Sequence, residues 1–530
     1  MSEPSRRTLL KGVAGVTVTG TALTGLTGGL PAVADDRHPR SCTTQVTTPK
    51  HELRAMWIAS VVNIDWPSAT GLSASAQQAE LIGWLDLAAA SRHNAVVLQV
   101  RPTADSFWPG ALEPWSRYLT GTQGGDPGWD PLGFAVTEAH RRTLELHAWF
   151  NPFRVSMNTD VSALVEDHPV RQHPDWLESY GGKLYYNPGQ PDARRFCVDA
   201  VMDAVTRYDI DAVHFDDYFY PYPVAGAPAF DDAAEYATYG DGRSLADWRR
   251  SNITDFIATL RRRMLRAKPW VQLGVSPFAV WRNRATDPQG SDTTAGVQTY
   301  DDLYADTRGW VRDGLLDYIC PQVYWSRGFT AADYEKVTSW WVNEVRGRPV
   351  HLYIGQATYK VAMNADPAWD DPAELSSHLE YNATFGGVVH GNVYFSGKDV
   401  RADRLGATTL LNQTWYTRPA LVPVTWWKDH SAPKPVQRLR RRGATLAWER
   451  GSRDAVSYAI YRFDGDDHRG GPDRCDLADA SHLVATQRHV DARQQTWTDP
   501  TAANARGRRV TYLVTEVDRL GNESKPARVR

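Results

Sequence analysis

Two adjacent carboxylates, Asp216 and Asp217, stand at the end of a short apolar run in the stretch HFDDYFYP, which extends from His214 to Pro221. Two carboxylates in contact cannot both ionise cheaply, so the pKa of one rises and that carboxyl keeps its proton at neutral pH. A protonated carboxyl can serve as a general acid, and its ionised neighbour can stabilise a developing positive charge. We therefore expect Asp216 and Asp217 to be catalytic.

The segment that carries this pair is one of eight runs of β-branched and aromatic residues. They are Arg54–Val61, Ala95–Arg101, Leu144–Asn151, Ala212–Asp217, Gln272–Phe278, Tyr318–Trp325, His351–Thr358 and Gly387–Phe395. Helix-like stretches such as Ala76–Arg92 and Pro191–Tyr208 separate the runs, a rhythm typical of parallel βα units. Eight such units predict an α/β fold, a closed (β/α)8 TIM barrel.

Active sites of such barrels lie at the carboxyl ends of the strands, so the residues that end these runs are candidates for the site. The candidate substrate-binding residues are Trp57, Arg101, Asn151, His214, Tyr218, Gln322 and Trp325. Arg101, Asn151, His214 and Gln322 are equally compatible with packing in the barrel layers. The chain has 21 tryptophans, whose flat faces suit stacking on sugar rings. Candidate stacking platforms are Trp57, Trp108, Trp149, Trp281 and Trp325.

The sequence pattern changes after the predicted barrel. After a last helix-like stretch from Ala402 to Tyr416 and a Pro- and Trp-rich passage, short alternating strands are expected at Ala444–Trp448, Ser457–Arg462, Gln495–Asp499 and Thr511–Asp518. They predict a small all-β sandwich that resembles a fibronectin type III module. The expected domains are a barrel over 50–418, a linker over 419–435 and the sandwich over 436–530. The arginine-rich run 438–442 is read as a solvated turn, with a weak wall-binding patch as the alternative.

The N-terminus has the pattern of an export signal. Ser5–Lys11 (SRRTLLK) is a twin-arginine motif, an apolar Gly-, Ala- and Thr-rich stretch follows, and Ala32-Val33-Ala34 forms a cleavage site. We expect a signal peptide over 1–34, a linker over 35–49, and a protein that is secreted or associated with the cell wall. No lipobox precedes Cys42, so no membrane anchor is expected.

Composition and cysteine spacing limit the remaining possibilities. A chain of 530 residues predicts at least two domains, and a net charge of −3 with no basic stripe gives no reason to expect nucleic-acid binding. Cys197 and Cys320 lie in apolar segments and are expected to be buried thiols, whereas pairing of Cys42 with Cys475 stays open. No His, Asp or Glu cluster has metal-ligand spacing. We expect a monomer without metal or cofactor.

Residues from about 50 to 415 resemble the glycosyl-hydrolase-like family 10. The resemblance rests on the motifs Glu52–Ala59 (ELRAMWIA), Gln99–Pro102 (QVRP), Glu113–Ser116 (EPWS), Glu138–His140 (EAH), His147–Pro152 (HAWFNP), Phe215–Pro221 (FDDYFYP), Ser276–Phe278 (SPF) and Pro321–Trp325 (PQVYW). It implies a (β/α)8 glycosidase whose substrate is a bacterial polysaccharide, the glycan strands of peptidoglycan, notably strands stripped of stem peptides.

The aspartate pair is similar to that of family 84 hexosaminidases, in which the acetamido group of the substrate is the nucleophile. In that scheme Asp216 holds the acetamido N–H and Asp217 protonates the leaving oxygen. Residues 211–216 also resemble the acidic run of family 18 chitinases, although His214 and Tyr218 replace two of its acids. Gln322-Val323-Tyr324 resembles the segment whose tyrosine contacts the acetamido group, which makes Tyr324 the third candidate catalytic residue.

Three alternatives remain at this point. In one, a single aspartate caps the following loop and only the other is catalytic. Asp216 would then be a covalent nucleophile, and the acid would come from elsewhere, with Glu113 as the best spare carboxylate. In another, the enzyme is a retaining glucan-type hydrolase with an aspartate nucleophile. In the last, the barrel is a catalytically inactive, lectin-like binder of the cell wall.

Overall fold

The computed structural model describes residues 48–465, 476–501 and 510–530. The expected signal peptide over 1–34 lies outside the described residues, as does nearly all of the linker over 35–49. Cys42 and Cys475 also lie outside them, so their pairing is not addressed. Cys197 and Cys320 are buried free thiols, as expected. No helix in the described part of the chain is long and apolar enough to cross a membrane.

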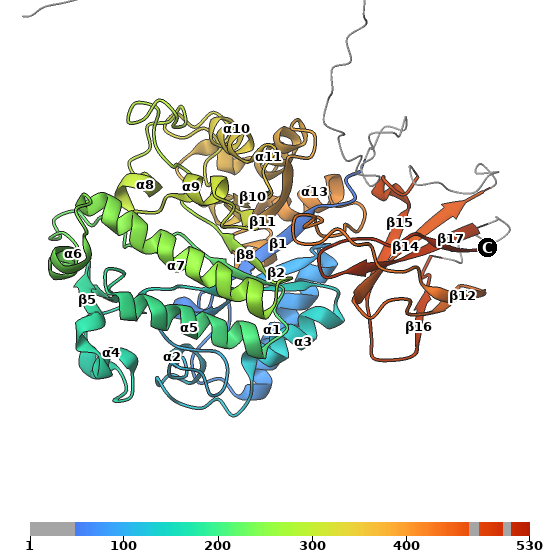
Figure 1. Ribbon diagram of the computed structural model, residues 1–530. Coiled ribbons are helices and arrows are strands. Elements are labelled where there is room, and N and C mark those ends of the chain that lie inside the picture. The colour runs from blue at the N-terminus through green and yellow to red at the C-terminus, as the bar shows by residue number, and fades with distance from the viewer. Residues whose placement is uncertain (1–47, 466–475, 502–509) are drawn as a thin grey trace, which may run out of the picture. The chain divides into compact units, whose positions relative to one another are not determined.

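Eight parallel strands close into a barrel in the order β1-β11-β10-β9-β8-β7-β3-β2 (Figure 1). They are β1 (Leu53–Ile58), β2 (Ala95–Arg101), β3 (Glu145–Phe150), β7 (Ala212–Phe215), β8 (Gln272–Val275), β9 (Tyr318–Ile319), β10 (His351–Gln356) and β11 (Val389–Tyr394). Seven of the strands fall within their predicted apolar runs, and β1 begins one residue before its run. The predicted (β/α)8 barrel is confirmed.

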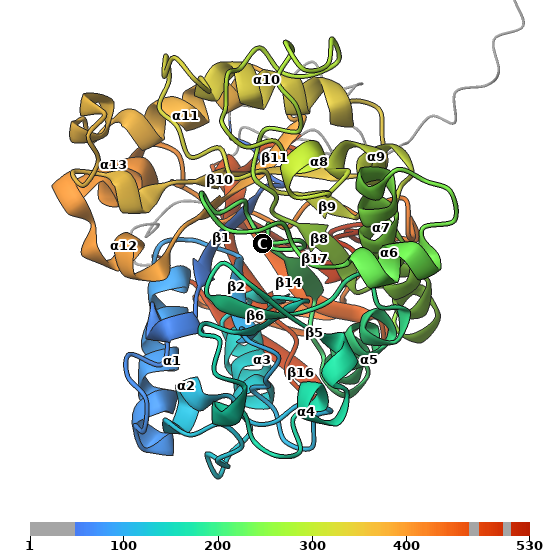
Figure 2. The same ribbon diagram turned by 90° about the vertical axis from the view of Figure 1, so that its left-hand side faces the viewer.

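Helices surround the strands, as the view in Figure 2 shows. The longer ones are α1 (Ala74–Ala90), α3 (Pro131–Arg141), α5 (Pro191–Arg207), α7 (Leu245–Ala267), α10 (Tyr334–Val345), α11 (Glu374–Ala383) and α13 (Ala407–Thr414). The shorter ones are α2 (Arg117–Thr120), α4 (Pro169–Gln172), α6 (Ala233–Tyr239), α8 (Thr299–Asp302), α9 (Thr307–Arg312) and α12 (Gly397–Ala402). Their starts follow local chemistry: Ser73 caps α1 by accepting from the Ala76 N–H, and Pro191 occupies the first turn of α5.

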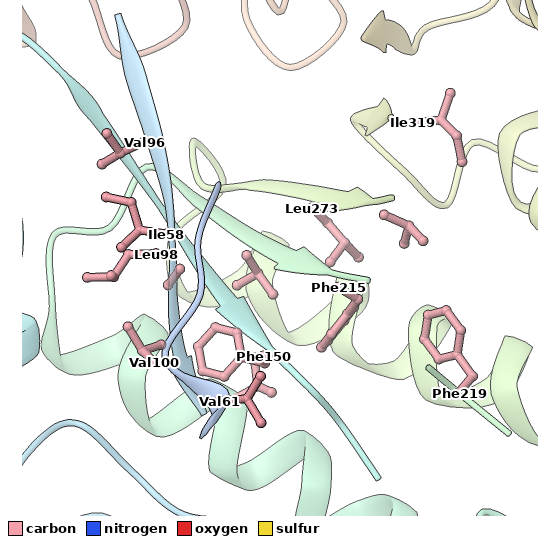
Figure 3. Packing of buried hydrophobic residues seen from close by; sticks show 14 of the residues in the cluster. Ile58, Val61, Val96, Leu98, Val100, Phe150, Phe215, Phe219, Leu273 and Ile319 are labelled. Carbon is pink, nitrogen blue, oxygen red and sulfur yellow. The ribbon is translucent and has the colours of Figure 1, made fainter. Parts of the chain in front are cut away.

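Alternate residues of each strand divide the core into two layers. Ile58, Leu98, Phe150 and Phe215 belong to the large cluster between strands and helices, part of which Figure 3 shows. Trp57, Val97 and Trp149, which directly precede the first three of these residues, belong to a second cluster, as does Ala212 of β7. This period of two places that second cluster in the barrel interior. Each large apolar side chain buried in this way contributes about 1.5–3 kcal/mol to folding.

A small antiparallel sheet follows β3 and was not predicted. It consists of β4 (Arg154–Ser156), β5 (Leu177–Tyr180) and β6 (Lys183–Tyr186) in the order β4-β6-β5. The turn between β5 and β6 is Gly181-Gly182, with φ of 55° and 77°. A Gly-Gly pair between two aromatic runs is a hairpin signal, so the sequence did contain the information.

The C-terminal part consists of two small antiparallel sheets. One contains β12 (Gln437–Arg442), β13 (Thr445–Glu449) and β16 (Gln494–Thr498) in that order. The other runs β15 (Leu483–Arg488), β14 (Ala455–Asp464), β17 (Val510–Asp518) and β18 (Ala527–Val529). The expected all-β character is confirmed, whereas the fibronectin type III resemblance stays a prediction. The arginine run forms strand β12 rather than a turn.

The passage 419–435 packs against the start of the barrel strands rather than forming a free tether. Lys428 Nζ lies 2.8 Å from Asp317 Oδ2, and the Trp427 indole donates to Asp317 Oδ1 across 3.1 Å. Asp317 directly precedes β9 and is 1% exposed. Burial raises the pKa of Asp317, but the charges of Lys428 and Arg261 outweigh it and hold that pKa below its usual value. This end of the barrel is opposite the one at which active sites of the fold lie.

Candidate active site

The two aspartates lie just past the last paired residue of β7. Strand β7 ends at Phe215, and Asp216 and Asp217 are 5% and 8% exposed. Because the strand stops there, the two side chains are not forced onto opposite faces of the sheet, as they would be inside a strand. Their hydrogen bonds reach residues at the ends of two other strands, β3 and β9. The pair therefore sits at the mouth of the barrel.

Asp216 is held by an amide network that fixes its orientation. Asn151, directly after β3, donates from Nδ2 to Asp216 Oδ2, and the Tyr218 backbone N–H donates to Oδ1 across 3.3 Å. The orientation of Asn151 follows from Gln99, whose Oε1 accepts from the backbone N–H groups of Ser60 and Val61. Gln99 must then turn its NH2 group to Asn151 Oδ1, which leaves the Asn151 NH2 group facing Asp216.

Asp217 has its own donors. The Tyr222 hydroxyl donates to Oδ2, and Gln322 Nε2 donates to Oδ1 across 3.1 Å. The same Gln322 Nε2 donates to the Ser276 carbonyl across 2.9 Å, so the amide spans two strand ends and cannot easily rotate away. Gln322 thus contacts the aspartate pair, and its role in substrate binding stays a prediction.

Burial raises the pKa of both carboxyls, and for Asp216 the charge of its neighbour adds to the rise. Burial, followed by the charge of Asp217, raises the pKa of Asp216 to about 7. Burial also raises the pKa of Asp217, although its bonds from Tyr222 and Gln322 partly offset the rise. The pair as a whole therefore retains one proton near neutral pH. In the free protein these shifts favour Asp216 as its holder, whereas the sequence assigned the proton to Asp217.

Arg154 is the cation beside the pair. It is 6% exposed, donates from Nη2 to Asn151 Oδ1 across 2.9 Å, and lies over the Tyr218 ring at 5.3 Å. Its charge lowers the pKa of both aspartates. The other buried arginines in the described residues, Arg54, Arg101, Arg249 and Arg308, each have a carboxylate within salt-bridge distance. No described carboxylate lies that close to Arg154, so the aspartate pair is the anion that balances it.

His214 lies one layer below the pair and is fully buried. Its Nε2 is 2.9 Å from Ser276 Oγ and 3.1 Å from the Trp57 indole N–H, and its Nδ1 is 2.9 Å from the Tyr318 hydroxyl. Burial lowers the pKa of His214 well below its usual value, so the ring is neutral. Gly274 makes room for this arrangement, since a Cβ there would overlap the Tyr318 ring. His214 and Trp57 thus form the floor of the site.

Arg101 and Glu113 form a separate buried ion pair. Arg101 donates from Nε and Nη2 to the two oxygens of the Glu113 carboxylate. The Tyr186 hydroxyl donates to the same carboxylate across 3.0 Å. Glu113 accepts all three of these bonds within a buried ion pair, which is a poor arrangement for a general acid. Arg101 also donates to the Asn151 and Pro152 carbonyls and so supports the loop that carries Asn151.

Aromatic residues surround the pair. Tyr218, Tyr324 and Trp325 are partly exposed, whereas Trp57, Trp108, Trp149 and Trp281 are at most 6% exposed. Of the five tryptophans considered as platforms, Trp325 alone is not buried. Burial and then nearby groups, the two aspartates among them, raise the pKa of Tyr324 well above its usual value, so its hydroxyl keeps its proton.

Three residues of the site were not selected from the sequence: Gln99, Arg154 and Tyr222. Gln99 lies two residues before the end of a predicted strand and was visible by position. Tyr222 follows the aspartates within a Pro-flanked turn, and Arg154 belongs to strand β4 of the small sheet that was not predicted, so proximity in the sequence was the remaining signal. No group of three or more His, Cys, Asp or Glu residues suited to a metal occurs in the part of the chain described here.

Comparison with known proteins places these observations in a family. The family model for glycosyl hydrolase-like 10 matches residues 52–371. The chain belongs to the glycosyl hydrolase-like 10 family. It is 48% identical over 489 residues to the glycosyl hydrolase YngK of Bacillus subtilis (strain 168), which covers 90% of this chain and 92% of that protein. The expected family and the expected class, a glycoside hydrolase, are confirmed.

Two further similarities were found. The chain is 39% identical over 366 residues to the glycosyl hydrolase DigH of Escherichia coli (strain K12), covering 65% of this chain and 82% of that protein. Among solved structures, the glycoside hydrolase domain of PgaB (BpsB) from Bordetella bronchiseptica is similar with a TM-score of 0.46 and 14% identity. That similarity covers 68% of this chain and 98% of the other.

Proposed function

We propose that this glycoside hydrolase is an exported enzyme that cleaves N-acetylhexosamine-containing cell-wall polysaccharide, namely the glycan strands of peptidoglycan, by substrate-assisted catalysis. The observation that carries the proposal is the buried Asp216–Asp217 pair, which holds one proton near neutral pH at the mouth of the barrel. A scheme that needs one acid and one adjacent anion matches this pair, whereas Glu113, the spare acid of the nucleophile scheme, is engaged by Arg101.

The roles follow from the way an N-acetyl sugar changes the pair. The acetamido N–H donates to Asp216, which stabilises the ionised form of Asp216 and lowers its pKa. The proton then resides on Asp217, where the adjacent negative charge retains it. Tyr324, whose hydroxyl keeps its proton, donates to the acetamido oxygen and aligns it with the anomeric carbon.

The chemical steps are balanced by these groups alone. The acetamido oxygen attacks the anomeric carbon while the glycosidic C–O bond breaks, and the leaving oxygen takes the proton of Asp217. The resulting oxazolinium ion is stabilised by the Asp216 carboxylate in a site from which most water is excluded. Water then adds to the anomeric carbon, gives a proton back to Asp217, and restores the acetamido group.

Two inhibitors test the mechanism. A thiazoline that mimics the cyclised N-acetyl sugar should inhibit, because ligands that resemble a transition state bind far more tightly than substrates. A fluorosugar that traps an aspartyl ester should leave the protein unlabelled by intact-mass analysis. A sugar trapped on Asp216 would instead establish a covalent nucleophile.

The substrate class is tested by comparing three polymers. Release of products from peptidoglycan glycan strands and chitin-like chains, but not from starch, is the expected result. Cleavage of starch would favour the glucan-type hydrolase, and binding of wall material without any cleavage would favour the lectin-like alternative. Export is tested separately by the paired substitutions Arg6→Lys and Arg7→Lys, which should retain the protein inside the cell.

A further inference from the structure

A row of aromatic rings leads away from the aspartate pair. The Tyr222 hydroxyl donates to Asp217, and the Tyr222 ring contacts the Phe278 ring with centroids 6.4 Å apart. The Phe278 ring contacts the Trp325 ring at 5.4 Å. All three side chains are partly exposed and follow β7, β8 and β9. A chain of partly exposed rings is the kind of surface on which successive sugar units stack.

The row ends at a surface hollow. Directly after Trp325, Ser326, Arg327 and Phe329 line a hollow of about 440 Å³, together with Thr294 and Asp366. These residues belong to the loops that follow β8, β9 and β10, so the hollow lies on the same face of the barrel as the aspartates. Its volume falls within the ~300–1,000 Å³ typical of small-molecule sites.

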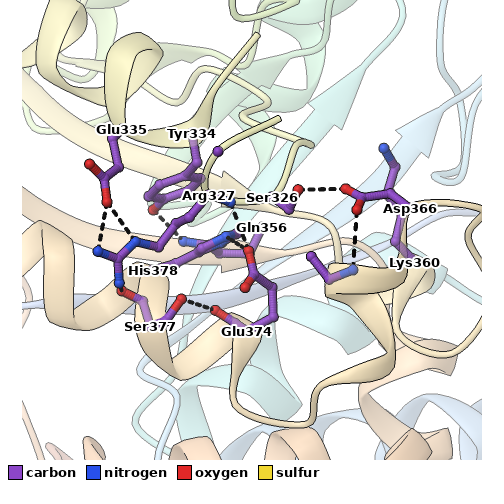
Figure 4. A network of polar contacts seen from close by, with 12 residues as sticks. Ser326, Arg327, Tyr334, Glu335, Gln356, Lys360, Asp366, Glu374, Ser377 and His378 are labelled. Carbon is purple, nitrogen blue, oxygen red and sulfur yellow. Dashed lines mark hydrogen bonds and ion pairs between the residues drawn. The ribbon is translucent and has the colours of Figure 1, made fainter. Parts of the chain in front are cut away.

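The polar side chains of the hollow are held in place by a network that Figure 4 shows. The Ser326 hydroxyl donates to Asp366, and Arg327 donates from Nε to Glu335 across 2.7 Å. The Arg327 backbone N–H donates to Glu374, which in turn contacts His378 at 3.0 Å. Side chains that are already fixed by hydrogen bonds lose little conformational entropy when they bind a ligand.

We infer that this hollow is a distal binding site for a sugar unit of the polymeric substrate, reached along the ring row from the site of cleavage. The inference rests on the proposed polysaccharide substrate. Sugar hydroxyls both donate and accept, and the hollow offers a carboxylate, a guanidinium group and hydroxyls beside the Phe329 ring. Arg327 is paired with Glu335, and Lys360 interacts with Asp366, so neither charge is unbalanced, which suits a neutral sugar rather than an ionic ligand.

The distal site predicts that longer glycans are better substrates. The test compares the parent with a Phe329→Ala, Asp366→Asn double variant on an aryl N-acetylhexosaminide and on chitin oligosaccharides of increasing length. The parent should gain kcat/KM with length. The variant should lose about tenfold on long chains, the size expected for one well-placed aromatic contact, and remain within about twofold on the aryl glycoside.

A second hollow supplies the matched control. It measures about 430 Å³ and is lined by Gln78 of α1 and Phe134 of α3. These helices belong to the layer outside the barrel strands. Phe134→Ala removes a ring from a hollow of nearly equal size and should leave the length dependence unchanged, with folding of each variant checked by thermal melting.

The outcomes separate this inference from the proposed function. A parent without length dependence, an unchanged double variant, or equal losses on short and long substrates would each overturn the distal site. If the parent cleaves no N-acetyl substrate, the proposed function fails. Calorimetric binding of the same oligosaccharides then decides whether the hollow binds a sugar unit. An affinity that rises with oligosaccharide length in the parent but not in the double variant supports the distal site. Any other pattern overturns the distal site.

Discussion

Arg154 donates a hydrogen bond from Nη2 to the side-chain oxygen of Asn151 across 2.9 Å, and the Asn151 amide in turn faces Asp216. A cation in this position favours the ionised form of the aspartate pair. Without it, both ionisation steps of the pair would move to higher pH. Arg154 is therefore a positioning and charge-balancing residue, since its contacts are with Asn151 and Tyr218 rather than with a carboxylate of its own.

We accordingly expect Arg154→Met to move both limbs of the pH profile of kcat/KM to higher pH, by about one pH unit. Activity below neutral pH should then fall about tenfold. Arg154→Lys keeps the charge and should keep the limbs near those of the parent. A purely structural role would lower activity at every pH without moving either limb, and that result would refute the electrostatic one.

The roles of the two aspartates can be separated by the leaving group. Asp217→Asn should lower kcat by about 10²–10⁴ on a glycan, because the amide cannot supply the proton. The loss should be much smaller on an aryl glycoside whose leaving group needs no protonation. Asp216→Asn should impair both N-acetyl substrates. If Asp216→Asn instead shows the dependence on the leaving group, the proton donor is Asp216.

The raised pKa of Asp216 also makes a prediction about stability. Burial and the charge of Asp217 raise it from 3.8 to about 7, so the folded protein binds this proton more tightly than the unfolded chain does. The associated stability is complete at pH values below the unfolded pKa and is lost as the pH rises through about 7. At roughly 1.36 kcal/mol per unit, the loss is at most on the order of 4 kcal/mol.

Asp216→Asn removes this titration. Its melting temperature should therefore exceed that of the parent clearly at about pH 8 and only slightly at about pH 5. Thermal melts of the two proteins over this range provide the measurement. A difference that does not grow with pH would mean that Asp216 does not carry the raised pKa.

Two truncations test the contacts of the passage 419–435. A chain that ends at residue 435 keeps Lys428 and Trp427 on Asp317 and should still hydrolyse soluble oligosaccharides. A chain that ends at residue 418 leaves Asp317 with Arg261 as its described ion-pair partner, at 3.3 Å. Removing one partner of a buried pair typically costs about 3–5 kcal/mol, so this chain should unfold at lower denaturant concentration. Equal stability of the two truncations would show that the passage is only a tether.

The sequence alone determined the barrel, because eight apolar runs separated by helical stretches leave few other ways to bury so many β-branched side chains. It also indicated where the candidate active site lies, since polar residues at strand ends must converge at one face of a parallel barrel. Asp216, Asp217, Asn151 and Gln322 are brought together in this way. The small sheet of β4, β5 and β6 was missed because its strands are only three or four residues long.

The tertiary structure decided which strand-end residues face the pair and which support the floor. Trp57 and His214 satisfy one another inside the barrel, and Arg101 is engaged by Glu113 twelve residues away. Tyr222 reaches Asp217 from a loop, and Arg154 reaches Asn151 from the short strand β4. Periodicity tells which face of a strand a residue occupies but not where a loop returns. The charge balance of the pair depends on those returning loops, because electrostatic energy follows distance and burial in space rather than separation along the chain.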